Sequence, residues 1–153
     1  MSSLVRIITA ALKRKGQQSI VFYHTTSAKN LQSIMEKGLF KGSYVTLTPF
    51  PYKRYPRNPY FKEKGISNYV RIDISLSPEE ASRYLGFMAG AHTADVLGID
   101  VTKMHLGNQP TPLKLTPKQF RILGQRLLEL PETVFLTLDT IPPSKIVGSE
   151  KLV

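Results

Sequence analysis

The stretch that decides the fold spans residues 19–49 and reads SIVFYHTTSAKNLQSIMEKGLFKGSYVTLTP. Its first part, residues 19–24, is a compact run of β-branched and aromatic residues, which predicts a buried strand that ends at His24. Its last part, residues 43–49, alternates between two kinds of side chain and predicts a second strand with two different faces. A helix is expected between these strands.

That helix has recognisable start and stop signals. Thr26 or Ser27 is placed to cap it, and Gly38 supplies the C-terminal stop. The apolar residues between them recur at intervals of three and four, at Leu31, Ile34 and Met35. The unit therefore reads as strand, polar corner, helix, strand.

Outside this unit, helices and strands follow one another without a regular βαβ rhythm, which favours the α+β class. The expected elements are a helix over 3–15, a long proline-rich loop over 49–66, a strand over 68–76, a helix that Ser77 caps and that ends between Gly86 and Gly90, a helix from Thr116-Pro117 to about Leu130, a strand over 133–139 and a short strand around 145–150. Residues 91–115 fit either a short helix or a strand.

Composition narrows the class of protein. The 153 residues are 41% hydrophobic, which is enough for one folded domain over residues 1–153. The chain has no cysteine, so we expect no disulfide, no thiolate nucleophile and no zinc site built on sulfur. No metal-binding motif and no membrane-spanning run is expected either. The first charges follow the first apolar stretch, the reverse of a secretory signal, so we expect no export by this N-terminus.

The positive charge is concentrated in two places. The chain carries a formal charge of +10, and residues 1–16 and 49–64 each contribute +4 of it. The first of these stretches is the predicted basic helix at the N-terminus. Such local basicity points to an anionic partner, either nucleic acid, a phosphate-bearing substrate or an acidic protein.

Three runs in the deciding stretch resemble the start of the ADP-ribosyltransferase-like domains of bacterial polymorphic toxins. They are Phe22-Tyr23-His24-Thr25-Thr26-Ser27, the helix that ends at Gly38-Leu39, and Ser43-Tyr44-Val45-Thr46-Leu47-Thr48-Pro49. A weaker similarity runs from Val134 to Gly148 and looks like the closing strand pair of that family. The resemblance implies an α+β fold with a split mixed sheet, flanking helices, and NAD bound across the split.

The resemblance also implies roles for single residues. His24 would hydrogen-bond the ribose next to nicotinamide, with Thr25 beside it, and Tyr44 or Thr46 would pack on the nicotinamide ring. A carboxylate late in the chain would stabilise the oxocarbenium-like centre, and the candidates are Glu150 and Glu132. Such domains act in the cytoplasm of a target cell, as the C-terminal part of a larger secreted effector in contact-dependent inhibition, and are neutralised by an immunity protein, here an acidic one.

A basic, aromatic segment lies in the predicted long loop. Cations and aromatic rings alternate there, and such a mixture binds phosphates while the rings stack on unpaired bases. The residues singled out for nucleic-acid binding are Tyr52, Lys53, Arg54, Tyr55 and Arg57. The alternative is a solvated loop whose tyrosines pack on the sheet.

Two other functions remain open at this point. A metal-independent ribonuclease, acting for example on transfer RNA, needs a base, an acid and a cation over the phosphate. The candidates for these roles are His24 with His92 or His105, Thr46 or Thr48, and Arg71 or Arg54. The other alternative is a nucleic-acid-binding module in which His24 is only structural.

Overall fold

The computed structural model describes residues 19–48, 68–100, 102, 111–130 and 133–152 of the chain. The predicted helix over 3–15, the loop over 49–66 and most of the stretch 101–110 lie outside these residues.

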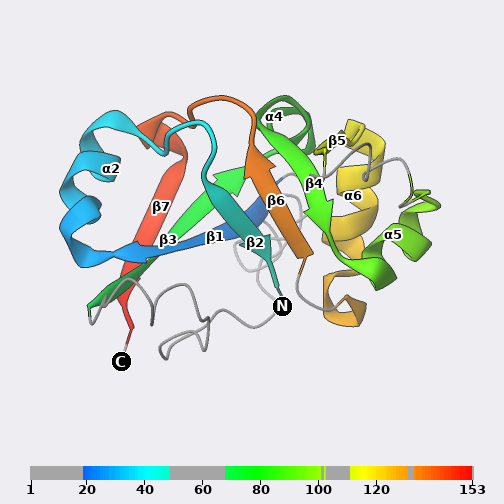
Figure 1. The fold of residues 1–153 in the computed structure, drawn as a ribbon, viewed down its shortest axis with the longest axis horizontal. Coiled ribbons are helices and arrows are strands. Elements are labelled where there is room, and N and C mark those ends of the chain that lie inside the picture. Colours follow the sequence, from blue (N-terminus) through cyan, green and yellow to red (C-terminus); the bar gives the residue numbers. More distant parts are fainter. Residues whose placement is uncertain (1–18, 49–67, 101, 103–110, 131–132, 153) are drawn as a thin grey trace, which may run out of the picture.

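One seven-stranded sheet forms the centre of the fold (Figure 1), with strand order β5-β4-β6-β2-β1-β3-β7. Its strands are β1 (Ile20–Ser27), β2 (Tyr44–Leu47), β3 (Tyr69–Leu76), β4 (Leu85–Ala89), β5 (Leu113–Lys114), β6 (Thr133–Thr137) and β7 (Ile146–Lys151). The last two strands of the chain, β6 and β7, are not neighbours, because β6 lies between β4 and β2 whereas β7 pairs with β3.

The α+β class is confirmed, but the prediction of a mixed sheet is wrong. Each pairing in the sheet is antiparallel among the strands that the structure describes. Parallel neighbours need long crossover connections. Here β2 reverses direction after β1 and pairs with it, and β3 pairs antiparallel with β1 on its other side.

Short helices flank the sheet. They are α2 (Leu31–Lys37), α4 (Pro78–Tyr84), α5 (Ala91–Leu97) and α6 (Pro117–Gln125), with 3-10 turns η1 (Ala28–Asn30), η3 (Leu127–Glu129) and η4 (Pro143–Lys145). In Figure 1, α2 lies beside the β1, β3 and β7 side of the sheet, and α5 and α6 lie beside β4. One helix, α2, thus lies at the β7 end of the sheet, and α5 and α6 lie at the β4 end (Figure 1).

Two helix starts agree with the sequence prediction. Ser77 accepts a hydrogen bond from the amide of Glu80, whose side chain accepts one from the Ser77 amide, so α4 opens with a full capping box. Thr116 and Gln119 form the same arrangement at the start of α6. These signals are local, because each joins two residues that are three positions apart.

Three predicted boundaries are wrong. The first strand does not end at His24, because β1 stays paired with β3 up to Ser27, opposite Tyr69. Neither Thr26 nor Ser27 caps α2, which begins after a 3-10 turn with Asn30 at its N-cap and no side-chain cap. The helix that Ser77 opens stops at Tyr84. The next residues form β4 instead, where Phe87 pairs opposite Phe135 of β6.

Residues 91–115, which the sequence left open, contain both kinds of element in their described parts. They begin with α5 and end with β5, which pairs with β4 at the edge of the sheet. None of the helices in the described ranges combines the length and the apolar character needed to cross a membrane.

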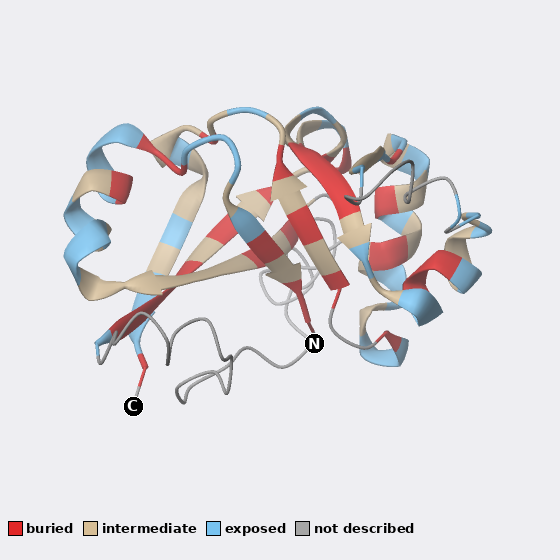
Figure 2. Cartoon of the chain, viewed as in Figure 1, coloured by how far each residue is buried: buried red, intermediate tan, exposed pale blue. Residues whose placement is uncertain are grey.

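Four phenylalanines form the centre of the core. Phe22 of β1 meets Phe135 of β6 edge-on with ring centroids 5.5 Å apart, and Phe87 of β4 meets Phe135 at 5.9 Å. Phe120 of α6 packs against both Phe22 and Phe135. These rings join the middle of the sheet to α6, and Figure 2 shows buried residues running through these elements. Of β1, Phe22 belongs to this aromatic core, whereas the C-terminal residues from His24 onward lie beyond it.

Candidate functional site

The seam between β1 and β2 is the place where the sheet opens. β1 pairs with β3 at eight positions from Ile20 to Ser27, but it pairs with β2 only where Tyr23 faces Thr46. Thr46 strengthens that single position, because its hydroxyl donates to the Tyr23 carbonyl oxygen at 3.3 Å. Beyond it, β1 continues with β3 alone. His24 is the first residue past the seam.

The His24 ring bridges the seam with a side-chain hydrogen bond. Its Nδ1 lies 2.7 Å from the carbonyl oxygen of Tyr44 at the start of β2. A carbonyl can only accept, so Nδ1 carries the proton and donates it. In the neutral ring, Nε2 is then left with a lone pair that can accept a hydrogen bond. The contact fixes both the orientation and the tautomer of His24.

His24 favours its neutral form. Burial lowers the pKa of His24 below its ordinary value of 6.5, because a charged imidazole is poorly solvated there. The bond to the Tyr44 carbonyl opposes this effect, since an imidazolium would also donate to it, but burial is the larger of the two causes. At neutral pH the ring therefore presents an acceptor, not a cation.

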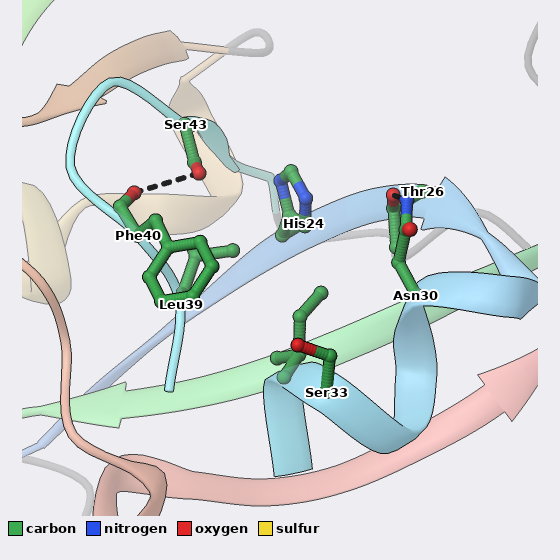
Figure 3. A pocket seen from close by; sticks show the side chains of 8 residues that line it. His24, Thr26, Asn30, Ser33, Leu39, Phe40 and Ser43 are labelled. Carbon is green, nitrogen blue, oxygen red and sulfur yellow. Dashed lines mark hydrogen bonds between the residues drawn. The ribbon is translucent and has the colours of Figure 1, made fainter. Parts of the chain in front are cut away.

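A pocket of about 270 Å³ opens beside this ring. Its lining comes from the end of β1, from the start of α2 and from the turn before β2: His24, Thr26, Asn30, Ser33, Ile34, Leu39, Phe40 and Ser43. Figure 3 shows the His24 ring with Thr26 and Asn30 on one side and Phe40 on the other. Apart from His24, the lining side chains are hydroxyls, one amide and apolar groups, so none of them is a lysine, an arginine or a carboxylate.

Local hydrogen bonds hold the polar part of this lining. Asn30 donates from Nδ2 to the Thr26 hydroxyl at 3.0 Å, which leaves the Thr26 proton available as a donor. Across the pocket, the Ser43 hydroxyl donates to the Phe40 carbonyl oxygen at 2.7 Å. The wall that contains Leu39 and Phe40 follows directly from Gly38, which adopts a positive φ of 89° at the end of α2. The predicted helix stop at Gly38 is thus confirmed and also forms the pocket.

Three predicted site residues lie close to His24 in the chain or the sheet but do not line the pocket. Thr25 alternates to the other face of β1 and pairs opposite Arg71. Thr46 is engaged with the Tyr23 carbonyl. The backbone carbonyl of Tyr44 accepts from His24, and the residue is 58% exposed. The predicted contact of Tyr44 with a nicotinamide ring stays a prediction.

Glu150 lies in a different cluster, two strands away from β1. It pairs opposite Arg71 on β3 and forms an ion pair with that guanidinium at 3.0 Å. Arg71 also donates to Asp73 at 2.8 Å and sits 5.3 Å from the centre of the Tyr23 ring. Burial and the negative charge of Asp73 raise the pKa of Tyr23, and Arg71 opposes them. The structure does not bring Glu150 into the His24 pocket.

The other predicted residues divide into two groups. His92 is exposed on α5, away from β1, and the Arg71 proposed for a ribonuclease is held by two carboxylates. Thr48, the alternative to Thr46, is buried directly after the end of β2. The other candidates lie outside the described residues: Glu132, His105, Tyr52, Lys53, Arg54, Tyr55 and Arg57. Their roles stay predictions.

Of the residues that line the pocket, only His24 is a predicted site residue. Among the others, Asn30, Ser33, Phe40 and Ser43 are polar or aromatic groups that the sequence analysis does not assign to a site. Asn30 and Ser33 are three residues apart, so they share a helical face, which is a signal that could have been read. Phe40 and Ser43 lie in a segment that follows Gly38 and contains Gly42. The glycines indicate a turn but do not say what the turn faces. Within the described ranges, no group of three His, Cys, Asp or Glu side chains could hold a metal ion.

Comparison with protein families and with curated proteins gives no match for this chain.

Proposed function

We propose that the chain is an ADP-ribosyltransferase-like enzyme that binds the nicotinamide-ribose end of NAD in the His24 pocket. The observation that carries the proposal is the fixed His24 ring. Its Nδ1 donates to the Tyr44 carbonyl, so the neutral ring offers Nε2 as an acceptor beside a pocket whose other described lining residues are uncharged. A ribose hydroxyl is a donor that suits this acceptor.

The rest of the lining suits the same ligand. Thr26, Asn30 and Ser33 offer hydroxyl and amide groups to a sugar or to a carboxamide, and the half-exposed Phe40 ring offers a face to a flat heterocycle. The volume of about 270 Å³ fits one end of a dinucleotide and not the whole molecule. The phosphates of NAD would therefore lie outside the pocket, where uncharged lining groups are no disadvantage.

The chemistry follows from the family that the sequence resembles. NAD supplies the ADP-ribosyl group: its bond from C1′ to nicotinamide breaks, nicotinamide leaves with the electron pair, and a bond from C1′ to the acceptor forms as the acceptor loses a proton. His24 holds the ribose, and a carboxylate from Glu150 or Glu132 would stabilise the positive charge that develops there. For Glu150 this requires the β7 edge to move toward the pocket, because Glu150 is paired with Arg71.

A ribonuclease is the alternative that the same ring supports, since a neutral imidazole is a competent general base. Cleavage of RNA also needs a cation over the phosphate. Among the described residues, neither a lysine nor an arginine lines the His24 pocket, and Arg71 is engaged by Asp73 and Glu150. The pocket therefore favours NAD over an RNA phosphate.

The proposed setting is that of a toxin acting in the cytoplasm of a target cell. A nucleic acid or a nucleic-acid-associated protein would be the acceptor, and an acidic immunity protein would bind the toxin. The formal charge of +10 supports both partners, since it attracts polyanions and acidic proteins alike.

The test incubates the full chain separately with NAD labelled in the nicotinamide ring and with total cellular RNA. The wild type should release nicotinamide, His24→Ala should lose at least about tenfold in that rate, and His92→Ala, which changes an exposed histidine on α5, should match the wild type. Cleavage of RNA without NAD that depends on His24 would support the ribonuclease instead. Nicotinamide release that is unchanged in His24→Ala would refute the proposed site.

A further inference from the structure

Thr137, the last residue of β6, is fully buried and bonds to Phe40 and Ser43, two residues that line the pocket. It lies at the end of β6, opposite the turn that carries Phe40 and Ser43. Four hydrogen bonds join Thr137 to that turn. Two come from its backbone, whose amide donates to the Ser43 carbonyl and whose carbonyl accepts from the Gly42 amide, both at 2.9 Å.

The other two bonds come from the hydroxyl, which acts on both sides of the turn at once. Thr137 Oγ1 donates to the Phe40 carbonyl oxygen at 2.9 Å and accepts from the Ser43 amide at 2.8 Å. The Ser43 amide has a second, longer contact with the Phe40 carbonyl at 3.3 Å. A valine has the same shape as threonine but can neither donate nor accept. A serine can do both.

The turn that Thr137 holds leads directly to His24. Ser43, which is bonded to Thr137 through its amide and its carbonyl, is followed in the chain by Tyr44, whose carbonyl accepts from His24 Nδ1 at 2.7 Å. β2 and β1 have no other paired position past the seam in the described ladder. On its other side, β2 pairs with β6, with Tyr44 opposite Leu136 and Val45 opposite Phe135. The Tyr44 carbonyl is therefore held by that ladder together with the hydrogen bonds that anchor Ser43.

We propose that Thr137 is a positioning residue of the pocket: its hydroxyl fixes the Phe40–Ser43 wall and, through Ser43, the Tyr44 carbonyl that orients His24. It touches no reacting atom. The enzymatic side of this inference rests on the proposed function, whereas the effect on the His24 ring does not. The two can therefore fail separately.

The experiment compares three variants of the full chain. Thr137→Val removes the hydroxyl and keeps the shape, and Thr137→Ser keeps the hydroxyl. Thr133→Val is the matched control, because Thr133 is a buried threonine on the same strand whose hydroxyl bonds to Thr93 at 2.6 Å, away from the turn. ¹⁵N NMR of the histidine rings reports which nitrogen of His24 carries the proton.

In the wild type, Thr137→Ser and Thr133→Val, we expect His24 to be protonated at Nδ1. In Thr137→Val we expect a mixture of the two tautomers, together with a fall of about tenfold in nicotinamide release. A purely structural role would lower the stability of both valine variants and leave the His24 signals unchanged. His24 signals in folded Thr137→Val that match the wild type would therefore overturn the inference.

A measurement on the wild type keeps the inference testable if Thr137→Val does not fold. The amides of Gly42 and Ser43 lie in an exposed turn beside Lys41, yet both donate to Thr137. Their hydrogen exchange should be strongly slowed relative to the Lys41 amide. Exchange of the Ser43 amide as fast as that of Lys41 would contradict the anchoring. If the His24 signals shift as expected but no variant releases nicotinamide, the positioning role stands and the NAD proposal fails.

Discussion

The carbonyl oxygen of Tyr44 lies 2.7 Å from Nδ1 of His24, across a seam at which β1 and β2 pair only through Tyr23 and Thr46. A side-chain hydrogen bond thus takes over where the backbone ladder stops. Where the β1–β2 ladder stops, α2 and the turn that follows it form a pocket beside His24. Nδ1 of His24 donates to the Tyr44 carbonyl, and Nε2 is left as an acceptor.

The stability of the protein should depend on pH through His24. Burial lowers the pKa of His24 from its ordinary 6.5, so between its folded and unfolded values the unfolded chain binds more protons. The contribution of neutral His24 to the free energy of unfolding is complete above pH 6.5 and is lost as pH falls through the pKa of His24 in the folded protein. We expect the advantage of the wild type over His24→Gln in urea unfolding to shrink from about pH 7.5 to about pH 5. An advantage that grows as pH falls would contradict the direction of this shift.

Two glycines with similar backbones should respond very differently to alanine. Gly38 and Gly42 have φ values of 89° and 88°, but an added Cβ at Gly38 would overlap the Ile141 carbonyl oxygen, whereas Gly42 has nothing within 4 Å. Gly42→Ala should cost about 1 kcal/mol from backbone strain. Gly38→Ala should cost more than about 2 kcal/mol, because the chain must also shift. Equal midpoints in urea for the two variants would show that Gly38 is not packed this closely.

Removing Arg71 should lower the free energy of unfolding more than removing the charge of its partner Glu150. Arg71 is buried and bonds both Asp73 and Glu150, so Arg71→Leu should cost about 3 kcal/mol by leaving carboxylates without their partner. The side chain of Glu150 is 46% exposed, so Glu150→Gln should cost less than about 1 kcal/mol. Urea unfolding of both variants measures this, and a larger loss for Glu150→Gln would refute the ranking.

Alanine variants of Phe40 and Met35 should distinguish the loss of a ligand contact from the loss of an exposed apolar side chain. Their exposed fractions are 54% and 45%, but only Phe40 lines the pocket. Phe40→Ala should raise the KM for NAD about threefold to tenfold through the lost ring contact, with little change in stability. Met35→Ala should leave the KM unchanged. A similar rise in KM for both variants would instead indicate a general effect on α2 and the turn.

The elements that could be predicted from sequence are those whose signals are local. The capping boxes of Ser77 with Glu80 and of Thr116 with Gln119 lie within a single turn and are read correctly. β4 was missed because Leu85–Ala89 continues an apolar run after α4, and only its pairing with β6 makes it a strand. The end of β1 was misplaced for the same reason, since Tyr69 and Val70 hold Ser27 and Thr26 in the ladder.

In the candidate site too, the part with a local signal could be predicted and the part that depends on distant residues could not. His24 could be found because it ends an apolar run at a polar corner. The wall of its pocket could not, because Ser43 depends on Thr137, 94 residues further along the chain. A single sequence gives no sign of such a pairing. Tyr44 was chosen for its ring, yet the structure shows its backbone carbonyl in contact with His24.

The most direct test of the central claim is a titration of the isotope-labelled full chain with NAD, followed by NMR at the His24 ring and at the amides of the pocket. We predict that the Nε2 signal of His24 and the amides of Thr26, Asn30 and Ser43 shift together and saturate, and that the exposed His92 does not shift. Signals around His24 that stay in place while NAD is added, or a saturating response elsewhere on the chain alone, would contradict the account.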